Sequence, residues 1–247
     1  MPRTARKQSS TGIYHVMMRG INRQSIFLDD EDNEKFLQTV SDCKKVSEFD
    51  LYAYCLMGNH VHLLIKEGKE TLEQIFKRIG SRYVYWYNWK YMRCGHLFQD
   101  RYKSETVEND PYFVTVLIYI HQNPIKAGFS KTIDDYKWSS YSEYVKKSRI
   151  IDTEFALELI GHSEFKKIMN RKIDGICLEN AEQRKRLTDD EFSKAIESSL
   201  NIKPNQIQFE SREGMEHILR AALTIEGAST RQLSRVTGIS ANIIWRL

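Results

Sequence analysis

His60 and His62 are the residues of this 247-residue chain whose types and spacing most directly suggest chemistry. They lie in residues 57–65 (MGNHVHLLI), which have the composition of a turn followed by a β-strand. Successive side chains of a strand alternate between faces, so both imidazoles share one face while Val61 and Leu63 share the other. Two neutral imidazoles on a stiff strand can bind a divalent metal ion that takes a third ligand from elsewhere. The alternative is two polar residues on the solvated face of an amphipathic strand.

A second candidate group lies on a helix that the sequence predicts between Asp110 and Pro124. An acidic N-cap followed by proline favours a helix start at Asp110-Pro111, and Pro124 favours its end. Tyr119 and Asn123 stand one turn apart at the edge of the apolar side of this helix. Both side chains can then face a site on a sheet, the tyrosine as a nucleophile and the amide as a ligand. The alternative is a half-buried tyrosine whose hydroxyl contacts water.

Between Glu73 and Lys103 the chain interleaves cations with aromatic residues. The formal charge of the whole chain is only +4, but this stretch sets seven cations against two acidic residues. Cations that follow phosphates beside aromatic faces that stack on bases favour single-stranded nucleic acid as a partner. The alternative is a helix whose aromatic residues fill a core and whose charges are solvated. The cations are Lys77, Arg78, Arg82, Lys90, Arg93, Arg101 and Lys103, and the aromatics are Phe76, Tyr83, Tyr85, Trp86, Tyr87, Trp89, Tyr91, Phe98 and Tyr102.

The remaining patterns predict the elements that would position these residues. Alternation and turn residues predict strands over residues 13–19, 51–56, 60–65 and 98–107, with the Gly58-Asn59 turn joining the second and third as a hairpin. Helical periodicity and N-capping signals predict helices over residues 30–46 and 72–91. The order of elements is therefore βαββαβ. We expect an α+β fold, a ferredoxin-like or RRM-like antiparallel sheet with helices on one face.

Beyond residue 147 the composition shifts to fewer aromatic residues, which predicts a domain boundary. We expect a first domain over residues 1–147, a helical connector over 148–187 and a smaller all-α region over 188–247. Residues 229–247 have the spacing of a helix-turn-helix around Gly238, with Ser240 able to cap the recognition helix. Arg231 and Asn242 are its candidate DNA-binding residues. An ordinary αα-hairpin would show a similar pattern.

Composition also argues against several classes of protein. Four cysteines are scattered without C-x-x-C spacing, which disfavours a zinc knuckle or a disulfide framework and favours a reducing compartment. No apolar leader segment follows the basic N-terminus, and no apolar run approaches the length of a membrane-spanning helix. We therefore expect a cytoplasmic protein with no membrane partner.

Four segments carry a more specific signal. They are residues 14–20 (YHVMMRG) with Asn22, Arg23 and Phe27, residues 57–64 (MGNHVHLL), residues 119–128 (YIHQNPIKAG) and residues 138–141 (WSSY). In this order and spacing they resemble the single-tyrosine transposases of the His-hydrophobic-His endonuclease class, specifically the REP-associated branch. The resemblance spans roughly residues 10 to 145. The C-terminal hundred residues lie outside it, although their last segment is similar to the helix-turn-helix tails fused to some members.

The resemblance implies that His60 and His62 bind a divalent ion, that Asn123 is the third ligand and that Tyr119 is the nucleophile. Two imidazoles and an amide oxygen accept Mg²⁺ or Mn²⁺, and the share of nitrogen favours Mn²⁺. A tyrosine with an ordinary pKa of about 10 is protonated at neutral pH, so the metal has to lower the barrier to attack on phosphate. The implied products are a phosphotyrosyl DNA intermediate and a free 3′-OH.

The implied partner is single-stranded DNA, from a hairpin-forming repeat, with Arg19 and Arg23 among its contacts. This chain departs from the family at Gly58, where proline is frequent, and at Asn123, where some relatives have glutamine, so Gln122 is the alternative ligand. Two other classes stay open: a domesticated DNA-binding protein that does not cut, and a metal-dependent phosphodiesterase that uses water as its nucleophile. The oligomeric state, monomer or homodimer, also stays open.

Overall fold

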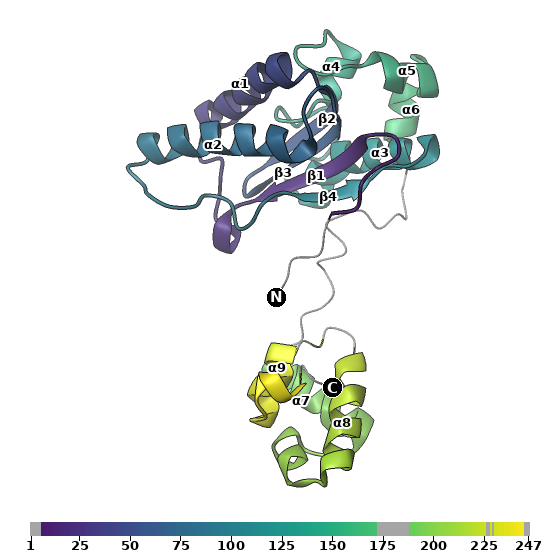
Figure 1. Cartoon of the computed structure of the whole chain (residues 1–247). Helices are drawn as coiled ribbons and strands as arrows, with labels where there is room; N and C mark the ends of the chain where they lie inside the picture. Colours follow the sequence, from purple (N-terminus) through teal and green to yellow (C-terminus); the bar gives the residue numbers. More distant parts are fainter. Residues whose placement is uncertain (1–5, 172–187, 226–227, 229, 245–247) are drawn as a thin grey trace. The chain divides into compact units, whose positions relative to one another are not determined.

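The computed structural model describes residues 6–171, 188–225, 228 and 230–244. The chain divides into two compact units, Met1–Leu178 and Glu179–Leu247, which are described separately (Figure 1). No helix in these described ranges has the length and apolar character needed to cross a bilayer.

The first unit is built on a four-stranded antiparallel sheet with the strand order β2-β3-β1-β4. The Gly58-Asn59 turn joins β2 to β3, as predicted. With the element order βαββαβ, this topology confirms the predicted ferredoxin-like α+β fold. The fourth strand is shorter than predicted, and Phe98 forms only an isolated bridge with Gly20. The strands are β1 (Ile13–Arg19), β2 (Asp50–Met57), β3 (His60–Lys66) and β4 (Lys103–Thr106).

Two long helices, α1 (Asp30–Ser47) and α2 (Leu72–Lys90), lie side by side on one face of the sheet (Figure 1). Each begins at a capping box, formed at Asp29 for α1 and at Thr71 for α2. On this face Met18 of β1 lies beneath α2, with its terminal carbon 3.7 Å from the point where Gly80 would carry a Cβ atom.

A third long helix, α3 (Asp110–Lys126), covers the opposite face of the sheet. His15 lies three positions before Met18 on β1, so the two side chains point to opposite faces. The ring of His15 contacts that of Tyr119 on α3, with 5.7 Å between centroids. Helices therefore cover both faces and not one, because the strands carry apolar side chains on both sides and each side needs a cover. The helix also continues two residues past Pro124, where its end was predicted.

Three short helices complete the first unit, and the last two lie beyond the boundary predicted at residue 147. Their side chains, including Phe165 and Met169, are buried in the same core as the sheet. The backbone amide of Asp152 donates to the carbonyl of Leu51 at 2.7 Å, and its carboxylate pairs with Lys44 at 2.6 Å. Residues 148–171 thus pack as part of the first unit. The helices are α4 (Tyr141–Val145), α5 (Glu154–Ile160) and α6 (Phe165–Met169).

The second unit is helical and has a small core of its own, centred on Phe192, Ile196 and Leu219. Gly238 joins α9 to α10 with a left-handed backbone, φ 74°. This placement agrees with the predicted turn, but residues 245–247 lie outside the described residues, so the helix-turn-helix stays a prediction. The elements are α7 (Asp189–Leu200), the 3₁₀-helix η2 (Pro204–Phe209), α8 (Arg212–Thr224), α9 (Thr230–Thr237) and α10 (Ala241–Ile244).

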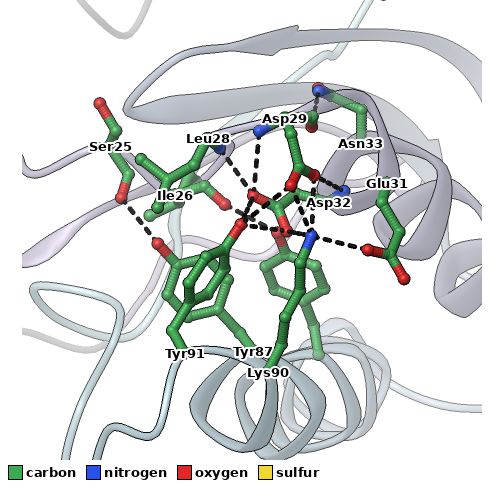
Figure 2. A network of polar contacts seen from close by, with 11 residues as sticks. Ser25, Ile26, Leu28, Asp29, Glu31, Asp32, Asn33, Tyr87, Lys90 and Tyr91 are labelled. Carbon is green, nitrogen blue, oxygen red and sulfur yellow. Dashed lines mark hydrogen bonds and ion pairs between the residues drawn. The ribbon is translucent and has the colours of Figure 1, made fainter.

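An ion network ties the end of α2 to the start of α1 (Figure 2). Lys90 Nζ lies 2.8 Å from Oδ1 of Asp29 and 2.9 Å from both Asp32 Oδ1 and Glu31 Oε2. The hydroxyl of Tyr91 donates to Asp32 Oδ2 at 2.9 Å. Burial acts to lower the pKa of Lys90, but its hydrogen bonds to the three carboxylates raise that pKa above its ordinary value. The hydrogen bond from Lys90 also lowers the pKa of Asp29.

Candidate active site

The two histidines of the predicted site lie at the start of β3. His62 is fully buried and His60 is 8% exposed. Their ring centroids are 4.9 Å apart and their planes are almost perpendicular, at 87°. Because His62 also contacts Tyr119 of α3, both imidazoles belong to the α3 face of the sheet.

Each of these imidazoles is held by a hydrogen bond at its Nδ1 atom. Nδ1 of His60 lies 2.6 Å from Oδ1 of Asn59, the preceding residue. Nδ1 of His62 lies 2.9 Å from Nε2 of His15 on the neighbouring strand. The Nε2 atoms of both rings are buried. Each ring is therefore oriented by a contact at Nδ1, and Nε2 is the nitrogen through which each could coordinate a metal ion.

Tyr119 brings its aromatic ring to this cluster from the middle of α3. Its ring lies edge-on to that of His62, with centroids 5.8 Å apart and an interplanar angle of 85°. Nζ of the exposed Lys126 lies 4.8 Å from the centroid of the tyrosine ring. The side chain of Tyr119 is only 2% exposed, so a phosphate reaches its hydroxyl only after covering side chains move.

The structure separates the two amides that the sequence left as alternative ligands. Gln122 Nε2 donates to the backbone carbonyls of Met169 and Arg171, at 2.8 Å each, and so points toward the end of α6. Asn123 is buried one turn beyond Tyr119, and its Nδ2 atom has no hydrogen-bond partner among the described residues. Gln122 is thus engaged away from the histidines, and Asn123 stays the candidate for a third ligand.

These residues fit a divalent ion by the chemistry of their donor atoms. In the part of the chain that the structure describes, no three His, Cys, Asp or Glu side chains are grouped to hold a metal. A third protein ligand must then be of another type, and the amide oxygen of Asn123 meets that requirement. Two imidazole nitrogens and one amide oxygen suit Mg²⁺ or Mn²⁺.

Two of the predicted DNA-binding cations share the face of the histidines. Arg19 pairs directly with His60 across β1 and β3, and residues directly opposite in an antiparallel pair lie on the same face. Lys103 of β4 is opposite Met17, which is itself opposite His62. Arg23 is exposed, and its backbone carbonyl accepts a hydrogen bond from Asn59 Nδ2 at 3.2 Å, so it lies beside the same site.

The other predicted DNA-binding residues lie elsewhere. Lys77, Arg78 and Arg82 are on α2, which covers the opposite face of the sheet. Arg78 forms an ion pair with Glu70, and Arg101 pairs with Glu73 at 3.3 Å. In the second unit Asn242 is exposed on α10, whereas the side chain of Arg231 lies outside the described residues.

His15 and His121 are buried histidines to which the residue patterns assigned no role. His121 Nε2 lies 2.8 Å from Ser140 Oγ, which also accepts from the backbone amide of Tyr54 at 2.9 Å. This links α3 to the WSSY segment and β2, and burial lowers the pKa of His121 to about 3. His15 instead contacts His62. The sequence signal for it was a lone histidine in an otherwise apolar strand, on the same face as Met17 and Arg19.

A sequence profile of IS200-like transposases matches residues 8–123, a span that runs from before β1 through Asn123. Over this span the chain is similar to IS200-like transposases. The matched span contains His15, both histidines of β3, Tyr119 and Asn123. The match assigns an enzymatic function to the first unit. The second unit lies outside the matched residues.

Two relatives are REP-associated tyrosine transposases by name. One, from Haemophilus influenzae, is 26% identical over 147 residues, which cover 55% of this chain and 82% of the relative. Another, from Escherichia coli K12, is 21% identical over 144 residues, covering 57% of this chain and 81% of the relative. The solved structure of a REP-associated tyrosine transposase bound to a REP hairpin matches the transposase fold with a TM-score of 0.53 and 19% identity, over 60% of this chain and 87% of that one.

Proposed function

We propose that this protein is a metal-dependent endonuclease and strand transferase that cuts single-stranded DNA by attack of Tyr119 on a phosphodiester. The observation that carries the proposal is the contact between Tyr119 and His62, 5.8 Å between ring centroids. The ring of Tyr119 on α3 thus packs against the buried imidazole of His62 on β3, which supports a role for its hydroxyl as the nucleophile. A packing role for Tyr119 would not require this neighbourhood of metal-binding side chains.

The proposed step exchanges one phosphate ester for another. The Tyr119 hydroxyl attacks the phosphorus, a bond from Oη to phosphorus forms, and the bond from phosphorus to the 3′ oxygen breaks. The phenolic proton passes through solvent to the departing oxygen, which leaves as a 3′-OH. Because the new ester keeps the energy of the broken bond, a second 3′-OH can reverse the step and join strands without a nucleotide cofactor.

Three side chains are proposed to hold Mg²⁺ or Mn²⁺, namely His60, His62 and Asn123. When bound, the ion supplies Lewis-acid polarisation of the scissile phosphate. The histidines meet the ion through Nε2, because their Nδ1 atoms are engaged by Asn59 and His15. Their burial keeps competing water away from the coordinating atoms.

Positively charged side chains on the same face are proposed to bind the DNA backbone. Arg19 and Lys103 flank the histidines through the strand register, and Lys126 lies over the Tyr119 ring. Cations so placed neutralise phosphates on either side of the scissile bond. Since a matched transposase structure has a REP hairpin bound, we propose a single-stranded, hairpin-forming repeat as the DNA, with the helices around Gly238 as a second contact.

A covalent-adduct assay tests this proposal. The full-length protein is incubated with end-labelled single-stranded hairpin DNA and Mn²⁺, and the products are separated on a denaturing gel. Wild-type protein is expected to yield a protein–DNA adduct. Tyr119→Phe is expected to fold, bind DNA and yield neither adduct nor cleavage product, with a stability loss of at most about 1 kcal/mol for one hydroxyl. Tyr112→Phe, on the same helix, is the matched control and should keep the adduct.

The competing functions give different results in this assay. A water-using phosphodiesterase would form no adduct, and its Tyr119→Phe variant would cut at the wild-type rate. A DNA-binding protein that does not cut would bind the hairpin and release no product in any form. Either result would reject tyrosine attack at this site.

A further inference from the structure

We infer that His15 and Asn59 are positioning residues, which hold His62 and His60 in the tautomer that presents Nε2 to the metal ion. The inference rests on the proposed function, because it concerns the same two ligands. It follows from the hydrogen bonds made at the far side of each imidazole. A neutral imidazole carries one proton, so a proton held on Nδ1 leaves the lone pair on Nε2.

For His60, the hydrogen bonds of Asn59 determine which nitrogen carries the proton. Asn59 Nδ2 lies 3.2 Å from the backbone carbonyl oxygen of Arg23. A carbonyl oxygen only accepts, so this end of the amide must be the NH₂ group and the other end the oxygen. That oxygen lies 2.6 Å from Nδ1 of His60 and also only accepts. Nδ1 of His60 must therefore be the donor, and Nε2 carries the lone pair.

For His62, the orientation is passed along a chain of three side chains. Nδ1 of His15 lies 3.8 Å from the Oε2 atom of Glu105 on β4, and a carboxylate favours a proton on the nitrogen that faces it. Nε2 of His15 then has the lone pair and accepts from Nδ1 of His62, 2.9 Å away. The opposite assignment would turn a lone pair of His15 toward the carboxylate. Nε2 of His62 is thus left to coordinate.

Both positioning residues are held on rigid parts of the sheet. His15 is fully buried in the middle of β1, with its ring centroid 5.1 Å from that of His62. The backbone carbonyl of Asn59 accepts from the amide of Gly20 at 2.9 Å, which ties the β2–β3 turn to the end of β1. Metal ligands oriented in this way spend no population in the wrong tautomer, and loss of such a partner typically weakens metal binding by about 10- to 100-fold.

Mn²⁺ titration of the full-length protein tests the inference without relying on activity. Binding is measured by calorimetry and by the electron paramagnetic resonance signal of free Mn²⁺, and thermal unfolding is recorded without metal. Wild-type protein should bind one ion, and His15→Leu and Asn59→Ala should bind it about 10- to 100-fold more weakly. His15→Gln should recover most of the affinity, because its Oε1 atom can accept from Nδ1 of His62.

A packing variant separates orientation from general destabilisation. Leu64 is fully buried and directly opposite His15 in the β1–β3 register, and it makes no side-chain hydrogen bond. Leu64→Ala should therefore lower the unfolding temperature but leave the Mn²⁺ affinity unchanged. Wild-type affinity in both His15→Leu and Asn59→Ala would overturn the inference and leave the proposed function standing, as would a parallel loss of affinity in Leu64→Ala. A wild-type protein that binds no Mn²⁺ would overturn the metal site and the inference together.

Discussion

The Lys90 network and the His60–His62 site are both clusters of polar side chains packed against a helix, on opposite faces of one sheet. In the Lys90 network the ammonium group contacts Asp29, Glu31 and Asp32, and Tyr91 completes Asp32 (Figure 2). The donors of Lys90 and Tyr91 there are paired with the acceptors of the carboxylates. This arrangement joins two helices, with its ammonium group surrounded by carboxylates of the same fold.

The site on the other face is completed on one side only. The fold engages Nδ1 of each imidazole through Asn59 and His15, and we propose that the Nε2 atoms coordinate the metal ion. In each imidazole one nitrogen is used for orientation, and the other is the one proposed to bind a ligand. A polar cluster that the fold completes stabilises the protein, and one that the fold orients but does not complete is a candidate for function.

The largest expected effect comes from removing the ligands. His60→Ala and His62→Ala should reduce cleavage to background while leaving DNA binding mostly intact, because the cations on the same face are proposed to supply most of the affinity through phosphate contacts. Asn123→Ala should be intermediate, with weakened Mn²⁺ binding in calorimetry. Cleavage is followed on labelled hairpin DNA and binding by gel shift. An equal loss of cleavage and binding would show that the histidines hold DNA or the fold, and not a metal ion.

Breaking the completed network should affect stability and not chemistry. In Lys90→Met the fully buried Asp32 loses its cation, which should lower the free energy of unfolding by about 3 kcal/mol. Mn²⁺ affinity and adduct formation at 25 °C should not change. Urea denaturation provides the measurement, and Lys45→Met is the control, since its 3.7 Å pair with Asp42 is exposed and should contribute less than about 0.5 kcal/mol. A loss of Mn²⁺ affinity in Lys90→Met would connect the two clusters.

His121 is a buried imidazole whose hydrogen bond to Ser140, like those of Lys90, is made within the fold. Burial lowers its folded pKa to about 3, whereas an unfolded histidine titrates near about 6.5. Between these values the unfolded state binds more protons, so stability falls as the pH drops below the unfolded pKa. From pH 7 to pH 5 this residue should remove about 2 kcal/mol of stability.

The variant His121→Gln checks this assignment. Urea denaturation at the two pH values should show a smaller drop in the variant than in the wild type, by the share that His121 contributes. The glutamine amide can still bond Ser140, so the packing is kept. Parallel pH profiles for the two proteins would mean that His121 does not titrate on unfolding in this range.

The smallest effect is expected from removing residues 188–247. Every proposed catalytic residue lies in the first unit, which has its own core, so Mn²⁺ binding and cleavage should persist. Affinity for hairpin DNA should fall by about tenfold, or about 1.4 kcal/mol, if the helices around Gly238 contribute a contact. Fluorescence anisotropy measures the affinity. A truncated protein that folds but cannot cut would show that the second unit completes the site.

Patterns that act over a few residues were readable from the sequence alone. Strand alternation placed His60 and His62 on one face, and helical spacing placed Asn123 one turn beyond Tyr119. Capping residues marked the starts of α1 and α2, and the turn residues marked the hairpin. These features depend on local backbone geometry, which neighbouring side chains determine directly.

Only the tertiary structure decided how distant segments meet. It placed α3 on the face opposite α1 and α2, and it joined residues 148–171 to the first unit. It also set the strand register that brings His15 to His62, 47 positions away in the chain, and the side-chain rotamers that turn Gln122 away from the site. Local periodicity says which face a side chain shares, but its partners depend on which apolar surfaces pack together, and that is settled by the burial of the whole core.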